Sequence, residues 1–202
     1  MKPAIWTWAV VASLALLAGC ASDQKLSDAA REHLTQVKSA CLPEVSFPTD
    51  VTSRDFAHRD ERMSAAGEME ALRGAGLVKM TPVVARAGDL TQPVRRYELS
   101  DAGTAYFHVL DRDSATGQTE GQFCYGHFAL DKVTRSDQPV KISGRKMAAF
   151  YYTYRIDGMP DWASRADIQA AFPTLAQIVN GVGNAEWHWT MNLTADGWKP
   201  AI

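Results

Sequence analysis

The stretch Ala148-Ala-Phe-Tyr-Tyr-Thr-Tyr-Arg-Ile156 is the most strand-like part of the chain and decides its fold class. Aromatic and β-branched residues favour pleated sheets, and here they lie inside a longer run from Val140 to Ile156. Two further segments have the same character, Gln122 to Val133 and Ala185 to Leu193 (AEWHWTMNL). We therefore predict an antiparallel sheet in the C-terminal half of the chain.

A helical segment is expected between the last two of these strands. It begins at Asp161-Trp162-Ala163, is interrupted near Pro173, and extends to about Val179, before the glycines at 181 and 183. Residues 120–202 are therefore predicted to form an antiparallel, β-rich part with one helical excursion over 161–179.

The N-terminal part, residues 27–110, is expected to begin with helices. Ser27 is a suitable N-cap for a helix that reaches about Ala40 and ends before Leu42-Pro43. Apolar residues at helical spacing predict a second helix from Asp55 to Arg73.

A β-hairpin is predicted after the second helix. Its strands run from Leu77 to Arg86 and from Val94 to Leu99, and a short helix follows from Ser100 or Asp101 to about Phe107. The predicted fold class is α+β, with N-terminal helices and a winged-helix-like hairpin followed by an antiparallel sheet.

The segments LRGAGLV (72–78) and YELSDAG (97–103) carry a family resemblance. Together they resemble the winged-helix part of bacterial transcription regulators, and the likeness covers about residues 60–107. Between Arg54 and Leu99 there are eight Lys or Arg and seven Asp or Glu residues, which is too balanced for a phosphate-binding surface. We therefore expect the shape of a winged helix without nucleic-acid binding.

The N-terminus carries an apolar run that ends in Leu17-Ala18-Gly19-Cys20. Lys2 precedes this run, and the 14 residues from Ile5 to Ala18 are too few to span a bilayer core but suit a signal peptide. The tetrapeptide resembles the lipobox of bacterial lipoproteins. The resemblance implies that residues 1–19 are a cleaved signal peptide, that Cys20 is lipidated, and that residues 20–26 form a short tether.

The residue after Cys20 bears on the membrane that holds the protein. In enteric lipoproteins an Asp at this position retains the protein in the inner membrane, and here the position is Ala21. The resemblance therefore implies an anchor in the outer membrane with the body facing the periplasm. The alternative is an ordinary secretory signal, which leaves Cys20 without a role.

The chain contains three cysteines, and lipidation of Cys20 leaves Cys41 and Cys124. An even number of cysteines in an oxidising compartment predicts a disulfide between them. The alternative is two separate buried thiols that act as small apolar side chains.

Aromatic residues gather on two of the predicted strands. Tyr152 and Tyr154 lie on one and Trp187 and Trp189 on the other, with His188 on the opposite face from the two tryptophans. We treat these five residues as a candidate binding surface, because exposed aromatic side chains mark recognition sites. The alternative is that they form the core of a sheet covered by a helix.

The sequence contains no pattern that points to a catalytic residue, a metal site or a cofactor. We expect a binding or envelope-assembly component without catalytic activity, whose partner is an envelope protein or peptidoglycan. Two alternatives stay open. One is an envelope hydrolase whose site is assembled across the sheet by His127 and His188 around Tyr152. The other is a carrier of a small ligand or lipid, with a cavity lined by the sheet aromatics.

Overall fold

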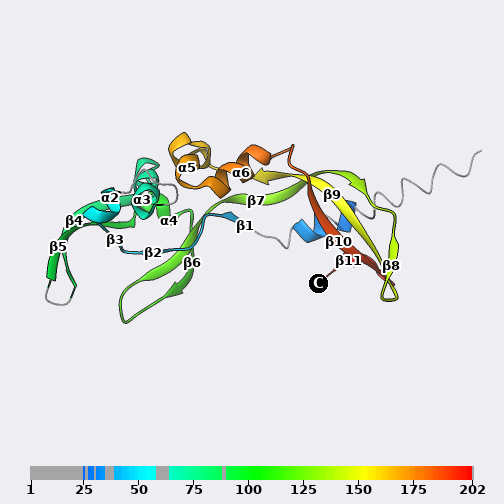
Figure 1. Ribbon diagram of the computed structural model, residues 1–202, viewed down its shortest axis with the longest axis horizontal. Coiled ribbons are helices and arrows are strands. Elements are labelled where there is room, and N and C mark those ends of the chain that lie inside the picture. Colours follow the sequence, from blue (N-terminus) through cyan, green and yellow to red (C-terminus); the bar gives the residue numbers. More distant parts are fainter. Residues whose placement is uncertain are drawn as a thin grey trace, which may run out of the picture.

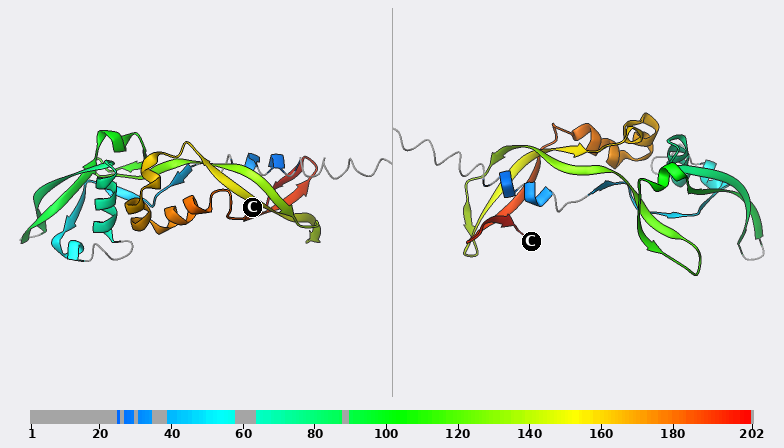
Figure 2. Two further views of the ribbon diagram at one scale, coloured as in Figure 1. Left: turned by 90° about the horizontal axis from the view of Figure 1, so that it is seen from above. Right: turned by 180° about the vertical axis from the view of Figure 1, so that it is seen from behind.

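The computed structural model describes residues 25, 27–29, 31–34, 39–57, 64–87 and 90–201, so the Leu17–Cys20 motif lies outside the described residues. The fold is mixed α+β and its strands pair antiparallel, as predicted. Figures 1 and 2 show an elongated molecule whose strands follow the long axis. Among the described helices, none is long and apolar enough to cross a bilayer.

One long strand, β7 (Thr119–Ser136), runs through much of the molecule (Figure 1). Its first half pairs on one edge with β6 (Phe107–Arg112) and on the other edge with β2 (Val45–Phe47). Further along, β7 pairs with β1 (Ser39–Cys41) from Cys124 to His127 and, on the opposite edge, with β9 (Arg145–Asp157) from His127 onward. Strands from both halves of the sequence therefore share β7, and the expected boundary near residues 110–120 falls within the β6–β7 hairpin.

The rest of this sheet lies at one end of the molecule. The sheet order is β1-β7-β9-β10-β11, and three of its strands are β8 (Val140–Ile142), β10 (Trp187–Thr194) and β11 (Gly197–Pro200). The predicted run from 140 to 156 is thus two strands, joined by a turn in which Ser143 and Gly144 both have positive φ. The strand β11 was not predicted, because four residues that include a proline give no period-2 signal.

A three-stranded sheet forms the opposite end (Figure 1). Its order is β3-β5-β4, and the strands are β3 (Thr49–Thr52), β4 (Val78–Ala87) and β5 (Leu90–Leu99). The predicted hairpin is therefore present: β4 is shifted by one residue from the prediction, and β5 begins four residues earlier than expected.

The single helix predicted from Asp55 to Arg73 is wrong. The structure has α2 (Ser53–Ala57) and α3 (Ala65–Gly74) instead. Ser64 is the N-cap of α3, and its hydroxyl accepts a hydrogen bond of 3.1 Å from the Gly67 amide. A serine that can satisfy an orphan amide in this way begins a new helix.

The short helix after the hairpin, α4 (Asp101–Thr104), is capped by Ser100 as predicted, but it ends earlier. Phe107 begins β6 rather than ending the helix. Gly103 permits a close approach here, because a Cβ at this position would lie 1.8 Å from the Leu77 carbonyl oxygen. The glycine of the segment YELSDAG therefore lets α4 pack directly on the chain entering β4.

The helical excursion is present where it was predicted, with its break at Pro173. It consists of a 3-10 helix η1 (Asp161–Ser164), α5 (Ala166–Ala171) and α6 (Pro173–Gly181). The Tyr154 hydroxyl on β9 donates a hydrogen bond of 2.6 Å to the Ile178 carbonyl, which holds α6 beside the sheet.

Two hydrophobic cores lie along the molecule. The first lies among α3, α5, α6 and β7, and Leu72, Phe123 and Ile168 are buried in it. The second joins the sheet to a helix near the N-terminus, described at residues 25, 27–29 and 31–34, which we call the N-terminal helix. The prediction that this helix reaches Ala40 is wrong, because Ser39 and Ala40 belong to β1.

The predicted pairing of Cys41 with Cys124 is present as a disulfide with an S–S distance of 2.15 Å. The two cysteines are direct cross-strand partners in the β1–β7 pair. The neighbouring Leu42 amide donates a backbone hydrogen bond of 2.8 Å to the Phe123 carbonyl. The disulfide therefore fastens the short strand β1 to β7, next to the first core.

Replacing both cysteines, Cys41→Ser with Cys124→Ser, should lower the free energy of unfolding by about 4 kcal/mol. The bridge joins residues 83 apart, and a loop of that length removes much entropy from the unfolded chain. Urea unfolding followed by tryptophan fluorescence measures the change. Reducing the unaltered protein should cause a similar loss. A loss below about 1 kcal/mol in both experiments would contradict the prediction.

Candidate functional site

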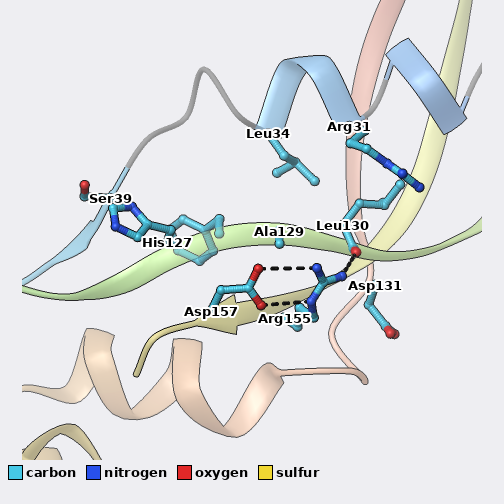
Figure 3. A pocket seen from close by; sticks show the side chains of 10 residues that line it. Arg31, Leu34, Ser39, His127, Ala129, Leu130, Asp131, Arg155 and Asp157 are labelled. Atoms are coloured by element: carbon cyan, nitrogen blue, oxygen red, sulfur yellow. Dashed lines mark hydrogen bonds and ion pairs between the residues drawn. The ribbon is translucent and has the colours of Figure 1, made fainter. Parts of the chain in front are cut away.

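A groove of about 710 Å³ lies between the N-terminal helix and the strands β1, β7 and β9 (Figure 3). Figure 3 shows Arg31 and Leu34 projecting from the helix above β7, with Arg155 and Asp157 below. Its lining combines apolar and charged side chains: Arg31, Leu34, Ser39, His127, Phe128, Ala129, Leu130, Asp131, Arg155 and Asp157.

The floor of the groove holds an ion pair on β9. Arg155 and Asp157 are two residues apart and therefore share a face of the strand. The guanidinium donates hydrogen bonds of 2.9 and 3.3 Å to the two carboxylate oxygens of Asp157, and a further one to the Leu130 carbonyl on β7. Both charged side chains are about half exposed, so the pair orients the guanidinium but adds little stability.

Two other charged residues of the groove differ in their surroundings. Asp131 accepts a hydrogen bond of 2.7 Å from the Thr153 hydroxyl, which is itself buried. Arg31 is exposed and has no hydrogen-bond or ion-pair partner among the described residues. A guanidinium without a partner presents donors that match a carboxylate or a phosphate.

The strand register places a hydroxyl, an imidazole and a carboxylate in one row across the groove. Ser39 on β1 pairs with His127 on β7, and His127 pairs with Asp157 on β9. These are the residue types of a nucleophile, a base and an orienting acid. However, Arg155 holds the Asp157 carboxylate, and Figure 3 shows that carboxylate turned toward Arg155 while the His127 ring lies on the Ser39 side. The base and the acid are therefore not aligned as in a triad.

The aromatic residues of the candidate binding surface lie largely in the second core. Tyr152 and Trp187 are cross-strand partners on the face that the N-terminal helix covers, and Tyr152 is only 3% exposed. Tyr154 is also buried, and its ring centroid is 4.2 Å from that of Trp187. The structure therefore places these side chains in the core and not on an open surface.

The remaining members of that set are partly accessible. Trp189 is half-buried and stacks on His33 of the N-terminal helix, with ring centroids 4.0 Å apart. His188 is exposed on the opposite face, as predicted, with its ring 5.6 Å from that of Tyr151. Among the described residues, Tyr152, Trp187 and Trp189 pack in or against the second core, between the N-terminal helix and the sheet.

His127 and His188 do not meet around Tyr152. His127 pairs with Asp157 of β9 and His188 pairs with Tyr151 of β9. Six residues along a strand correspond to about 20 Å. The hydrolase site expected from these two histidines is therefore not assembled. Among the described residues there is also no group of three or more His, Cys, Asp or Glu side chains that could hold a metal ion.

Sequence reasoning missed Arg31, Ser39 and Arg155 as site residues. The one local signal is the spacing of Arg155 and Asp157 at the end of a strand, which puts opposite charges on one face. Arg31 and Ser39 reach the groove only because the chain folds the N-terminal helix back over β7, and no local pattern predicts that packing.

We compared the chain with protein-family models, with curated proteins and with solved structures, and none of them matches it.

A buried histidine lies in the contact between the N-terminal helix, which forms one wall of the groove, and the sheet. His33 is 6% exposed, and its Nε2 has no hydrogen-bond partner among the described residues. Burial lowers the pKa of His33 below the ordinary value of 6.5, because the charged ring loses its hydration. The folded state therefore favours a neutral imidazole packed against Trp189.

Acidification should weaken the contact between the N-terminal helix and the sheet. A lowered pKa in the folded state means that the unfolded or detached state binds the proton more readily. The contribution of the neutral His33 to stability is therefore fully present above pH 6.5 and is lost as the pH falls through the folded-state pKa. We therefore expect amide hydrogen exchange of residues 31–34, corrected for the intrinsic rate, to become faster as the pH is lowered from about 7.5 to about 5.5. His33→Phe should remove this dependence, whereas His188→Phe, on the exposed face, should keep it. Unchanged protection across this interval would contradict the prediction.

Proposed function

We propose that the protein is a lipid-anchored component of the bacterial envelope whose body faces the periplasm and binds a partner. The observation that carries the proposal is the motif Leu17-Ala18-Gly19-Cys20 after a short apolar run. The disulfide between Cys41 and Cys124 supports export, because disulfides persist in oxidising compartments. Ala21 after the motif favours the outer membrane over the inner one.

The groove beneath the N-terminal helix is the binding site that we infer for the partner. Arg31 supplies a guanidinium without a partner among the described residues, and Leu34 and Phe128 supply apolar surface beside it. An acidic segment of an envelope protein fits this combination, since its carboxylate would meet Arg31 and its apolar side chains would cover the groove wall. In this proposal the ion pair of Arg155 with Asp157 orients the groove floor and takes no part in catalysis.

We also infer that the three-stranded end is a winged-helix-like module used for protein contacts. The order α3, β4, β5, with β3 pairing to β5, supports this comparison. Three of its arginines are paired with acids: Arg96 pairs with Asp50 at 2.7 Å, and Arg73 and Arg95 both pair with Glu70. Paired cations leave little charge for DNA phosphates.

Labelling tests the anchor directly. Cells given radioactive palmitate should incorporate the label into this protein, and Cys20→Ser should abolish the incorporation because the acyl acceptor sulfur is gone. The variant should then be found unprocessed or outside the membrane fraction. Ser22→Ala, two residues away, is the matched control and should be labelled normally. Absence of label from the unaltered protein would refute the anchor.

Photo-crosslinking tests the groove. A photoreactive residue placed at Ser39 should give a discrete adduct in intact cells, and Arg31→Glu should reduce its yield at least tenfold, since a charge-assisted hydrogen bond is replaced by repulsion. Arg54→Glu, an exposed arginine on α2, is the control and should leave the yield unchanged. An adduct that is equally strong in the Arg31→Glu variant would exclude the groove as the acid-binding site.

A further inference from the structure

Exposed apolar side chains gather at one end of the molecule. Val140 and Ile142 on β8 are 54% and 52% exposed, and Leu193 on β10 is 40% exposed. Isolated exposed apolar residues are common, but here they lie on both faces of one sheet end: Val140 and Ile142 share one face of β8, and Leu193, across β9, shares the other face with Lys146. This end is formed by β8, β10 and β11 and lies opposite the three-stranded sheet (Figures 1 and 2).

The strand register interleaves these residues with basic ones. Lys141 on β8 pairs with Lys146 on β9, and Lys146 pairs with Leu193 on β10. Ile142 pairs with Arg145 next to the turn. We call the set Val140, Lys141, Ile142, Arg145, Lys146 and Leu193 the basic hairpin tip.

The cations of the basic hairpin tip are not neutralised. Lys141, Arg145 and Lys146 are exposed, and none has an acidic partner among the described residues. Arginines elsewhere on the same sheet are paired, for example Arg135 with Glu186 at 3.1 Å. The tip therefore offers positive charge together with apolar side chains, a combination that suits the interface of an anionic lipid bilayer.

The start of the N-terminal helix lies beside the same end of the sheet. Lys199 on β11 forms an ion pair of 3.6 Å with Glu32, and a surface depression is lined by Lys25 and Asp28 together with Gly197 and Trp198. Lys25 follows Cys20 by five positions, and an extended chain of that length spans at most about 18 Å. An anchor at Cys20 would thus hold this end of the sheet close to the membrane.

We propose that the basic hairpin tip rests on the headgroup layer of the membrane that holds the protein. Val140, Ile142 and Leu193 enter the interface, while the three cations meet lipid phosphates. The tip then acts with the anchor as a second membrane contact and sets the direction of the long axis. This proposal rests on the membrane attachment in the proposed function, but a different set of residues carries it.

The experiment uses the full chain reconstituted in vesicles of phosphatidylethanolamine and phosphatidylglycerol that contain a spin-labelled lipid. A fluorophore attached through an unnatural amino acid at Ala195, in the exposed β10–β11 turn, leaves every residue of the tip intact. A fluorophore at Val84, which is 72% exposed at the opposite end, is the reference. We expect the lipid to quench the dye at Ala195 strongly and the dye at Val84 weakly. Equal quenching at both positions overturns the proposal.

Two variants identify the forces. The triple variant Lys141→Gln, Arg145→Gln and Lys146→Gln should weaken the contact about fivefold for each charge removed. Vesicles of phosphatidylcholine, which is zwitterionic and has no net charge, should weaken the contact of the unaltered protein in the same way. Val140→Ser with Ile142→Ser should also reduce quenching, whereas Val84→Ser should not. Unchanged quenching in both tip variants overturns the proposal. All these side chains are exposed, and an intact Cys41–Cys124 disulfide on a non-reducing gel verifies the fold.

The two proposals fail in different ways. Palmitate labelling at Cys20 without quenching at Ala195 removes the membrane contact of the tip and leaves the anchor. Quenching at Ala195 without palmitate labelling leaves the contact and removes the anchor.

Discussion

The pairing of β7 with strands on both of its edges is the constraint on which the rest of the structure depends. Eighteen residues in one strand extend over about 60 Å. Along that length β7 pairs with β2 and β6, then with β1 and β9. Neither hydrophobic core would be complete without it, because Phe123 lies in the first core and Leu130 in the second. The disulfide to Cys41 is attached to this same strand, next to the first core.

The N-terminal helix gives the second core its cover and creates the groove at the same time. Ala29, His33 and Leu34 are buried against the sheet, while Arg31, which lines the groove beside Leu34, is exposed. The Nε2 atom of His33 has no hydrogen-bond partner in the described part of the chain, and a buried polar atom of this kind costs stability at the contact. The helix is therefore fastened to the sheet by apolar area and by ring stacking on Trp189, and less by polar contacts. A site built beneath such a helix opens more readily than one built between strands.

Periodicity and composition predicted the strands over 122–133 and 185–193, the helical excursion with its break at Pro173, and the cysteine pair. These features follow from local patterns or from simple counting. The turn at Ser143-Gly144 had a local signal as well, because this dipeptide favours positive φ. The break before α3 depends on one side chain, Ser64, which caps a helix in the middle of a helical pattern. The groove as a whole had no signal beyond the spacing of Arg155 and Asp157, since Arg31, His127 and Arg155 come together only through tertiary packing.

The formal net charge of −2 conceals an uneven distribution of paired and unpaired cations. At the three-stranded end, Arg73, Arg95 and Arg96 are paired with Glu70 or Asp50, so these three cations present little net charge. At the basic hairpin tip, three cations lie beside exposed apolar residues without acidic partners among the described residues. Paired cations gain little from a distant anionic surface, whereas unpaired cations are attracted to it within about 10 Å. An elongated body with this arrangement orients in the field of an anionic membrane, with the tip toward the lipid and the three-stranded sheet away from it. The groove with Arg31 then lies between these ends, on the side of the N-terminal helix, where a partner in the periplasm can reach it.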